Sequence, residues 1–176
     1  VVDKGSSFEI RPTYGQAVIT MLARLGGRPV GLVANNPIVY GGAMNADAAR
    51  KQNHFMELCD TFHLPIVFLV DVPGFMVGPQ AEEEGTLREG MRLVYTAGQL
   101  QVPTITLIIR KCYGMAGMAT SNKNDVDLKL AWPSGEWGSL PFEGGVAAAF
   151  RREIAAAEDP KVREQELEAE LRAYAS

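Results

Sequence analysis

The chain has 176 residues, 47% of them hydrophobic, which is enough apolar side chain for the core of one domain and argues against intrinsic disorder. A formal net charge of −4 and a pI near 5.3 argue against a nucleic-acid or anionic-membrane surface, because both need clustered Lys and Arg. No apolar run approaches the roughly 20 residues of a membrane span, and the first residues lack a signal-peptide pattern. We therefore expect a cytoplasmic or organelle-matrix protein.

The first part of the chain predicts a β-hairpin followed by a helix. Residues 14–25 and 28–37 read as two strands joined by the Gly26-Gly27 turn. Asn45 is a good helix N-cap, and the apolar spacing after it continues to about His63.

The middle of the chain predicts strands that alternate with helices. Residues 66–70 form an apolar run without alternation, as expected for a strand covered by helices on both faces. A helix capped by Thr86 and a strand at residues 102–109 follow, and this β-α-β order implies parallel strands. A loop is expected at 76–85, a strand at 128–132, and helices at 146–157 and from 159 onward. The fold class is therefore α/β.

Two backbone turns are the candidate chemical features, because they follow neighbouring strands. Ligands of parallel α/β sheets bind at the carboxyl ends of strands, here at residues 71–75 and at Gly114-Met115-Ala116-Gly117. Unpaired amides at such turns can form an oxyanion hole, but glycines there can equally serve only tight turns. Both interpretations stay open on spacing alone. The chain has no recognisable nucleophile, phosphate-loop or dinucleotide motif.

Polar side chains indicate a chemical site less clearly than these two turns do. Asp71, Asn35 and Asn36 are expected to bond to the backbone of their own turns, and this is favoured over a general-base role for Asp71. Cys59 and His63 have the spacing of a metal pair on a helix, but nothing nearby completes a site, so packing is favoured. Packing or a surface position is also favoured for His54. Glu136 and Glu143 are expected to be caps or ion-pair partners.

Five segments, taken together, resemble a known family. GRPVGLVANNP, DVPGFMVG, RKCYGMAGMA, LAWP and EGGVAAAFRREI are similar, in this order, to the carboxyl-terminal half of the β-type carboxyltransferase subunit of biotin-dependent acyl-CoA carboxylases. The resemblance implies a crotonase-like (ClpP/crotonase) ββα superhelix as a single domain. Residues 1–176 would be the carboxyl-terminal carboxyltransferase domain, ending before the family's final segment.

The resemblance also implies an activity. In this family CO2 passes from N-carboxybiotin to the α-carbon of an acyl-CoA such as acetyl-CoA or propionyl-CoA. Backbone amides hold the ureido oxygen, and the freed biotin nitrogen takes the α-proton, so neither a side-chain base nor a metal is required. The amino-terminal half holds the acyl-CoA, and this half would be inactive without it. The other implied partners are a biotin carboxyl carrier protein, biotin carboxylase and further copies of the subunit, with no nucleic acid or membrane.

The family's Tyr-Gly-Gly-Ala segment falls on Tyr113-Gly114-Met115-Ala116. The amides of Met115 and Ala116 are thereby predicted to form the oxyanion hole. Gly74, Phe75, Tyr113, Gly114 and Gly117 are predicted to contact biotin, and Met118 to influence the choice of acyl chain. Met115 replaces the family's second Gly, which would cost about 1 kcal/mol if that position required a positive φ.

Two alternative functions remain at this point. One is a subunit of a biotin-dependent decarboxylase or transcarboxylase with the same fold. The other is a noncatalytic assembly module whose loops only pack against partners.

Overall fold

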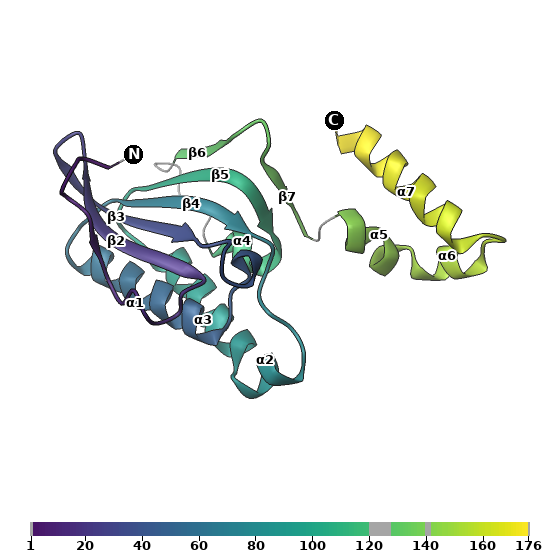
Figure 1. Ribbon diagram of the computed structural model, residues 1–176, viewed down its shortest axis with the longest axis horizontal. Helices are drawn as coiled ribbons and strands as arrows, with labels where there is room; N and C mark the ends of the chain where they lie inside the picture. Colours follow the sequence, from purple (N-terminus) through teal and green to yellow (C-terminus); the bar gives the residue numbers. More distant parts are fainter. Residues whose placement is uncertain (1, 120–127, 140–141, 176) are drawn as a thin grey trace. The chain divides into compact units, whose positions relative to one another are not determined.

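The computed structural model describes residues 2–119, 128–139 and 142–175. The chain divides into two compact units, Val1–Trp137 and Gly138–Ser176. Within the described residues the first unit contains a seven-stranded sheet in the order β1-β2-β3-β4-β5-β6, and β7 also pairs with β5 (Figure 1). The strands are β1 Phe8–Glu9, β2 Val18–Leu25, β3 Arg28–Asn35, β4 Ile66–Val72, β5 Thr104–Tyr113, β6 Leu128–Ala131 and β7 Glu136–Gly138.

The predicted hairpin is confirmed. β2 and β3 pair antiparallel from Val18 opposite Asn35 to Leu25 opposite Arg28. The two residues between the strands, Gly26 and Gly27, have φ of 58° and 80°. Positive φ at both positions gives a tight turn whose twist matches that of the strands, and glycine adopts it without steric cost.

The parallel part of the sheet is also confirmed. β3 pairs parallel with β4, β4 with β5, and β5 with β6. β4 and β5 are longer than predicted, since they continue to Val72 and Tyr113. The polar residues expected after each apolar run therefore lie inside the strands.

The main helices of the first unit cover one face of the sheet (Figure 1). α1 Ala46–Thr61 buries Phe55, Met56 and Cys59 in the core with Ile66, Phe68 and Val70 of β4. The alternate residues of β4 are half-buried, and Ile105 of β5 is 41% exposed. The prediction that residues 66–70 are covered by helices on both faces is therefore wrong for the described residues, because an all-apolar strand does not report which face is covered.

The caps predicted for the two long helices of the first unit, at Asn45 and Thr86, have different outcomes. The Asn45 side chain accepts from the amide of Ala48 at 3.0 Å, so the cap of α1 is confirmed. α3 Thr86–Gln99 begins after Gly85, whose φ is 75°, and the Thr86 hydroxyl is buried without capping the helix. The Thr86 cap was therefore wrong. The predicted loop 76–85 contains a short helix, α2 Pro79–Glu83, which begins with proline at its first turn.

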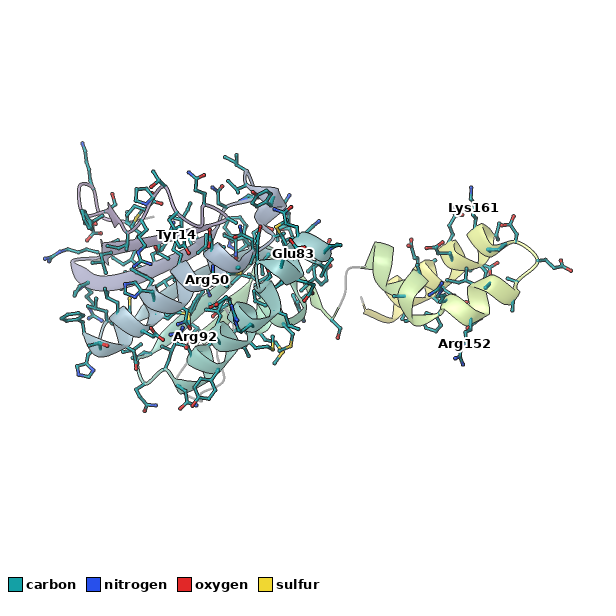
Figure 2. All side chains as sticks on the ribbon, turned by 90° about the horizontal axis from the view of Figure 1, so that it is seen from below. Tyr14, Arg50, Glu83, Arg92, Arg152 and Lys161 are labelled. Carbon is teal, nitrogen blue, oxygen red and sulfur yellow. The ribbon has the colours of Figure 1, made fainter. Side chains whose placement is uncertain are left out.

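An ion-pair network joins α1 to α3. Arg50 Nη1 lies 3.0 Å from Asp47 Oδ1, and Arg50 Nε lies 3.3 Å from Glu89 Oε1. The hydroxyl of Tyr14 donates to Asp47 at 2.8 Å, and Figure 2 shows Tyr14 and Arg50 close together. Burial, together with the bond to Asp47, raises the pKa of Tyr14. The segment before β2 is thus fixed to α1.

The second unit consists of α5 Phe142–Ala149, α6 Arg151–Ala156 and α7 Pro160–Ala175. The single helix predicted at 146–157 is interrupted, because Phe150 leaves the helical conformation with φ −108° and ψ 20°. The helix predicted after Asp159 is confirmed. The Asp159 carboxylate accepts from the amides of Lys161 and Val162 at 3.0 and 3.2 Å. Arg163 of α7 pairs with Glu153 of α6 at 2.7 Å.

The close contact between β3 and α1 gives a testable prediction. A Cβ at Gly31 would overlap Cys59 Sγ and lie 3.2 Å from Phe55 Cε1. Gly31→Ala should therefore lower the free energy of unfolding by about 1–3 kcal/mol through overpacking, as measured by urea denaturation. The matched control is Gly98→Ala on α3, where an added Cβ meets no atom within 4 Å and stability should stay equal or rise slightly. Equal stabilities of the two variants would contradict the packing described.

Candidate functional site

The two predicted turns follow strand ends that lie side by side. β4 and β5 are parallel neighbours, and Val72 near the end of β4 pairs with Cys112 near the end of β5. Pro73-Gly74 and Tyr113-Gly114 therefore leave the same edge of the sheet. The structure brings the two groups of predicted site residues together at this edge.

One side of the candidate site is formed by the turn after β4. Gly74 has φ 146°, and an added Cβ would meet no atom within 4 Å, so the space beside it is open. The Gly74 carbonyl accepts from the Met44 amide at 3.0 Å, and the Met76 amide donates to the Met44 carbonyl at 2.9 Å. The ring of Phe75 packs on α3, where a Cβ at Gly90 would lie 2.8 Å from Phe75 Cζ. The turn is thus held by its backbone, and the Phe75 ring acts as an anchor.

The other side of the candidate site is formed by the first turn of the short helix α4 Gly114–Met118. Gly114 has φ 58°, whereas the described non-glycine residues with positive φ are Arg11, Tyr40 and His63. Met115 is therefore unstrained, and its replacement of a glycine carries no backbone cost here. The first amides of a helix lack intrahelical acceptors, and in α4 these include the amides of Met115 and Ala116. Met115 and Met118 are 40% and 41% exposed, whereas Ala116 is fully buried.

Tyr113 and Gly117 hold α4 in place. Tyr113 is 2% exposed, and its hydroxyl donates to Glu136 Oε2 of β7 at 2.8 Å. Glu136 is therefore a hydrogen-bond acceptor within the sheet. A Cβ at Gly117 would lie 2.9 Å from Cys112 Sγ, so this glycine allows α4 to approach β5 closely. These contacts assign both residues a packing role, and their predicted contact with biotin stays a prediction.

Asp71 is bonded to the neighbouring strand. Its carboxylate accepts from Arg110 Nε at 3.1 Å and from the Lys111 amide at 3.3 Å. The expectation that Asp71 bonds within its own turn was wrong, because its side chain lies in β4 and faces β5. The hydrogen bond to Asp71 raises the pKa of Arg110. Arg110 was missed as a functional candidate, although its place directly after an apolar strand was a usable signal.

The two asparagines at the end of β3 behave differently. Asn36 Oδ1 accepts from the amide of Ile38 at 3.3 Å, as predicted for a local turn. Asn35 Oδ1 instead accepts from the amide of Asp71 at 3.1 Å, so the turn prediction for Asn35 was wrong. Asn35 is inside β3, where its side chain bridges to β4.

The other chemical candidates do not converge. Cys59 is fully buried, while His54 and His63 are exposed and His63 lies beyond the end of α1. In the described ranges, no group of three or more His, Cys, Asp or Glu side chains could hold a metal ion. Glu143 lies among the residues whose side chains are not described. No described helix is long and apolar enough to cross a membrane.

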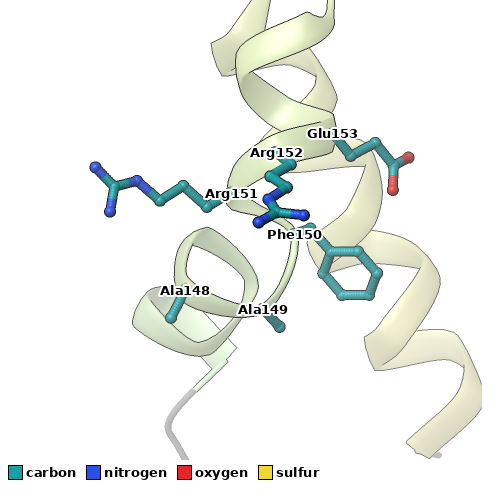
Figure 3. Close-up of a pocket in the computed structure, with 6 residues that line it drawn as sticks. All are labelled: Ala148, Ala149, Phe150, Arg151, Arg152 and Glu153. Atoms are coloured by element: carbon teal, nitrogen blue, oxygen red, sulfur yellow. The ribbon is translucent and has the colours of Figure 1, made fainter.

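Two hollows lie away from the predicted site residues. One, of about 380 Å³, is lined by Ile108, Lys129, Leu130, Ala131 and Trp137. The other, of about 520 Å³, is formed where α5 meets α6 by residues 148–153 (Figure 3). Arg151 and Arg152 extend in different directions there, so their guanidinium groups do not form one anion site.

This fold, in which the ends of β4 and β5 are adjacent, is the crotonase-like α/β class predicted from sequence, and comparison with known proteins confirms the class. Residues 1–176 match the family described as Carboxyl transferase domain, and the chain belongs to that family. The methylmalonyl-CoA carboxyltransferase 12S subunit of Propionibacterium freudenreichii subsp. shermanii is 41% identical over 161 residues, which are 91% of this chain and 31% of that protein.

Other relatives agree with this assignment. A biotin-dependent acetyl-/propionyl-coenzyme A carboxylase beta5 subunit of Mycobacterium leprae is 39% identical over 158 residues, 89% of this chain and 29% of its own length. A solved transcarboxylase 12S structure with methylmalonyl-coenzyme A has a TM-score of 0.89 and 40% identity, covering 97% of this chain and 33% of that chain. The present chain thus spans about a third of the length of these relatives.

The buried thiol of Cys59 gives a prediction about pH. Burial raises its pKa from 9.0 to about 12, so above pH 9 the unfolded state loses this proton while the folded state keeps it. The thiol should therefore make the free energy of unfolding fall between pH 9 and 12, by up to about 1.4 kcal/mol per pH unit. Chemical denaturation of wild type and Cys59→Ala across this range measures the difference in slope. Parallel curves would show that Cys59 is not desolvated.

Proposed function

We propose that this chain is the biotin-side half of an acyl-CoA carboxyltransferase, which transfers CO2 from N-carboxybiotin to the α-carbon of an acyl-CoA. The observation that carries this proposal is the adjacency of the ends of β4 and β5, which brings the Gly74 turn and the α4 amides to one edge. The membership of the carboxyl transferase domain family supports it.

In this proposal the amides of Met115 and Ala116 donate hydrogen bonds to the ureido oxygen of biotin. Preorganised backbone donors stabilise charge that develops there, and one such donor is typically worth about 3–4 kcal/mol. The open space beside Gly74 and the 40% exposure of Met115 leave room for a ligand to approach this edge. When bound, carboxybiotin would supply CO2 and, once CO2 has left its ureido nitrogen, a nitrogen base for the α-proton of the acyl-CoA.

The side chains at this edge fit a site that works through its backbone. The Asp71 carboxylate is engaged by Arg110, and the Tyr113 hydroxyl by Glu136. Both groups have structural partners, and in this proposal the biotin nitrogen takes the α-proton. In this proposal Met118, which is 41% exposed on α4, contacts the acyl chain.

The proposal extends to partners outside this chain. The relatives are about three times as long, and one solved relative is described as a hexamer and multienzyme core. We expect the acyl-CoA to bind mainly to an amino-terminal carboxyltransferase half. Biotin would arrive on a carboxyl carrier protein that is charged by biotin carboxylase, and the full-length subunit would form oligomers. Alone, this half should not turn over.

A second candidate function uses the same site in another pathway. The methylmalonyl-CoA decarboxylase subunit alpha of Propionigenium modestum is 39% identical over 161 residues, as similar as the carboxylase relatives. Similarity therefore does not separate carboxylase, decarboxylase and transcarboxylase. An acyl-CoA panel assayed in both directions with the natural protein and its biotinylated carrier would separate them.

Biotin binding can be tested without turnover. Titration of the isotope-labelled chain with biotin methyl ester should shift the amide resonances of Gly74, Phe75, Met115 and Ala116. Methyl pentanoate, which lacks the ureido ring, is the control and should leave them unchanged. No shift under saturating biotin ester would instead favour a noncatalytic assembly module.

The role of the α4 amides can be tested through Gly114. Gly114→Ala forces φ 58° on a residue with a Cβ, at a cost of about 1–2 kcal/mol, so the turn should move and carboxyl transfer should fall about 10–100-fold. Gly26→Ala imposes the same φ of 58° in the β2–β3 hairpin and is the matched control. Steady-state kinetics in the natural protein measure both. Equal activities would argue against a site at α4.

A further inference from the structure

The pairing of β4 with β5 is irregular immediately before the candidate site. Val70 pairs with Ile108, but the next pair is Val72 with Cys112. Between these pairs β4 has one residue, Asp71, whereas β5 has residues 109–111. Extra residues on one strand form a β-bulge, which bends the strand and changes its direction. This bulge therefore sets the direction in which β5 continues to Tyr113 and α4.

The side chain of Asp71 binds the bulge. Its carboxylate accepts from Arg110 Nε at 3.1 and 3.2 Å, and Arg110 Nη2 lies 3.0 Å from Oδ2. The same carboxylate accepts from the amide of Lys111 at 3.3 Å. A carboxylate thus engages a backbone donor and a side chain of the extra segment at once. The contacts to the guanidinium are charge-assisted and have a fixed geometry.

Asp71 is itself fixed by two other segments. Its amide donates to Asn35 Oδ1 of β3 at 3.1 Å. Its carbonyl oxygen lies so close to Gly42 that a Cβ there would be 2.5 Å away. The side chain of Asp71 is 12% exposed, whereas that of Arg110 is 53% exposed. The buried Asp71 is therefore held in place, and its carboxylate in turn holds the more exposed side chain of Arg110.

The carboxyl-terminal end of β5, at Tyr113, is held by a different hydrogen bond. The Tyr113 hydroxyl bonds to Glu136, and the charge of Glu136 also contributes to the raised pKa of Arg110. The four residues from Arg110 to Tyr113 thus have polar anchors at both ends. Gly114 and the amides of Met115 and Ala116 follow directly.

We propose that Asp71 and Arg110 are positioning residues, which fix the β5 bulge and thereby aim the first-turn amides of α4 at their ligand. This inference rests on the proposed function. It assigns the Asp71–Arg110 pair a role in the rate of carboxyl transfer, because an error of about 1 Å in the position of a catalytic group can cost roughly 100-fold. A half-exposed ion pair without such a role would contribute little to stability.

The experiment uses the natural protein that contains this chain, with its biotinylated carrier. Asp71→Asn and Arg110→Gln should each lower kcat about 10–100-fold, with the KM for acyl-CoA within about twofold of wild type. Arg110→Lys keeps the charge but loses the bidentate contact with Asp71. Its kcat should therefore lie between that of Arg110→Gln and that of the wild type. The double variant should be no slower than the slower single variant, because both changes break one contact.

The matched control is Arg92→Gln on α3, which breaks the pair of an exposed arginine with Glu57 at 3.6 Å and should leave kcat unchanged. Thermal unfolding of every variant separates lost positioning from lost folding. If Asp71→Asn does not fold, Arg110→Gln decides the question.

Three results would overturn parts of this scheme. Wild-type protein that transfers no carboxyl group would overturn the proposed function, and the inference with it. An active wild type with Arg110→Gln as fast as Arg92→Gln would overturn only the positioning role. Activity lost in proportion to the unfolded fraction would also overturn that role.

Discussion

The parallel pairing of β4 with β5 is the constraint on which the rest of the first unit depends. Because β3, β4 and β5 run parallel, a crossover must join each to the next, and the crossover helices α1 and α3 lie on one face of the sheet. The same pairing brings the two strand ends to one edge. A one-residue slip would turn every side chain of a strand to the opposite face, so the buried Ile66, Phe68 and Val70 also fix the register of the site.

Apolar packing and polar bonds have separate tasks in this arrangement. In the core on the helix side, α1 and β4 contribute more buried residues than any other element. Two of the polar contacts lie at or near the ends of elements, where Asn45 caps α1 and Asp71 engages the bulge. Burial thus determines which face of each strand is inside, and the polar bonds determine where each strand stops or turns.

Much of the fold was readable from the sequence, because its signals are local. The Gly26-Gly27 hairpin, the Asn45 cap and the alternation of apolar strands with helices each follow from short-range rules. The family resemblance predicted the crotonase-like class and the acyl-CoA carboxyltransferase relatives. The failures needed information from distant segments. Asp71 was expected to bond locally, yet its partners Arg110 and Lys111 are remote in sequence. The bulge left no compositional signature, and the interruption at Phe150 occurs within a uniformly helical pattern.

Donors that belong to the main chain have a consequence for how such a site varies and how it is detected. In the proposed site, replacing Met115 by another residue compatible with α4 would leave its amide in place, so an alanine scan would detect only the supporting side chains. Amide-to-ester exchange in the backbone, which deletes the N–H and keeps the side chain, is the change that reaches it. In the proposed site, Met115 and Met118 are half-exposed beside these amides, so a substitution there would change the contact with the substrate and retain the donor amides.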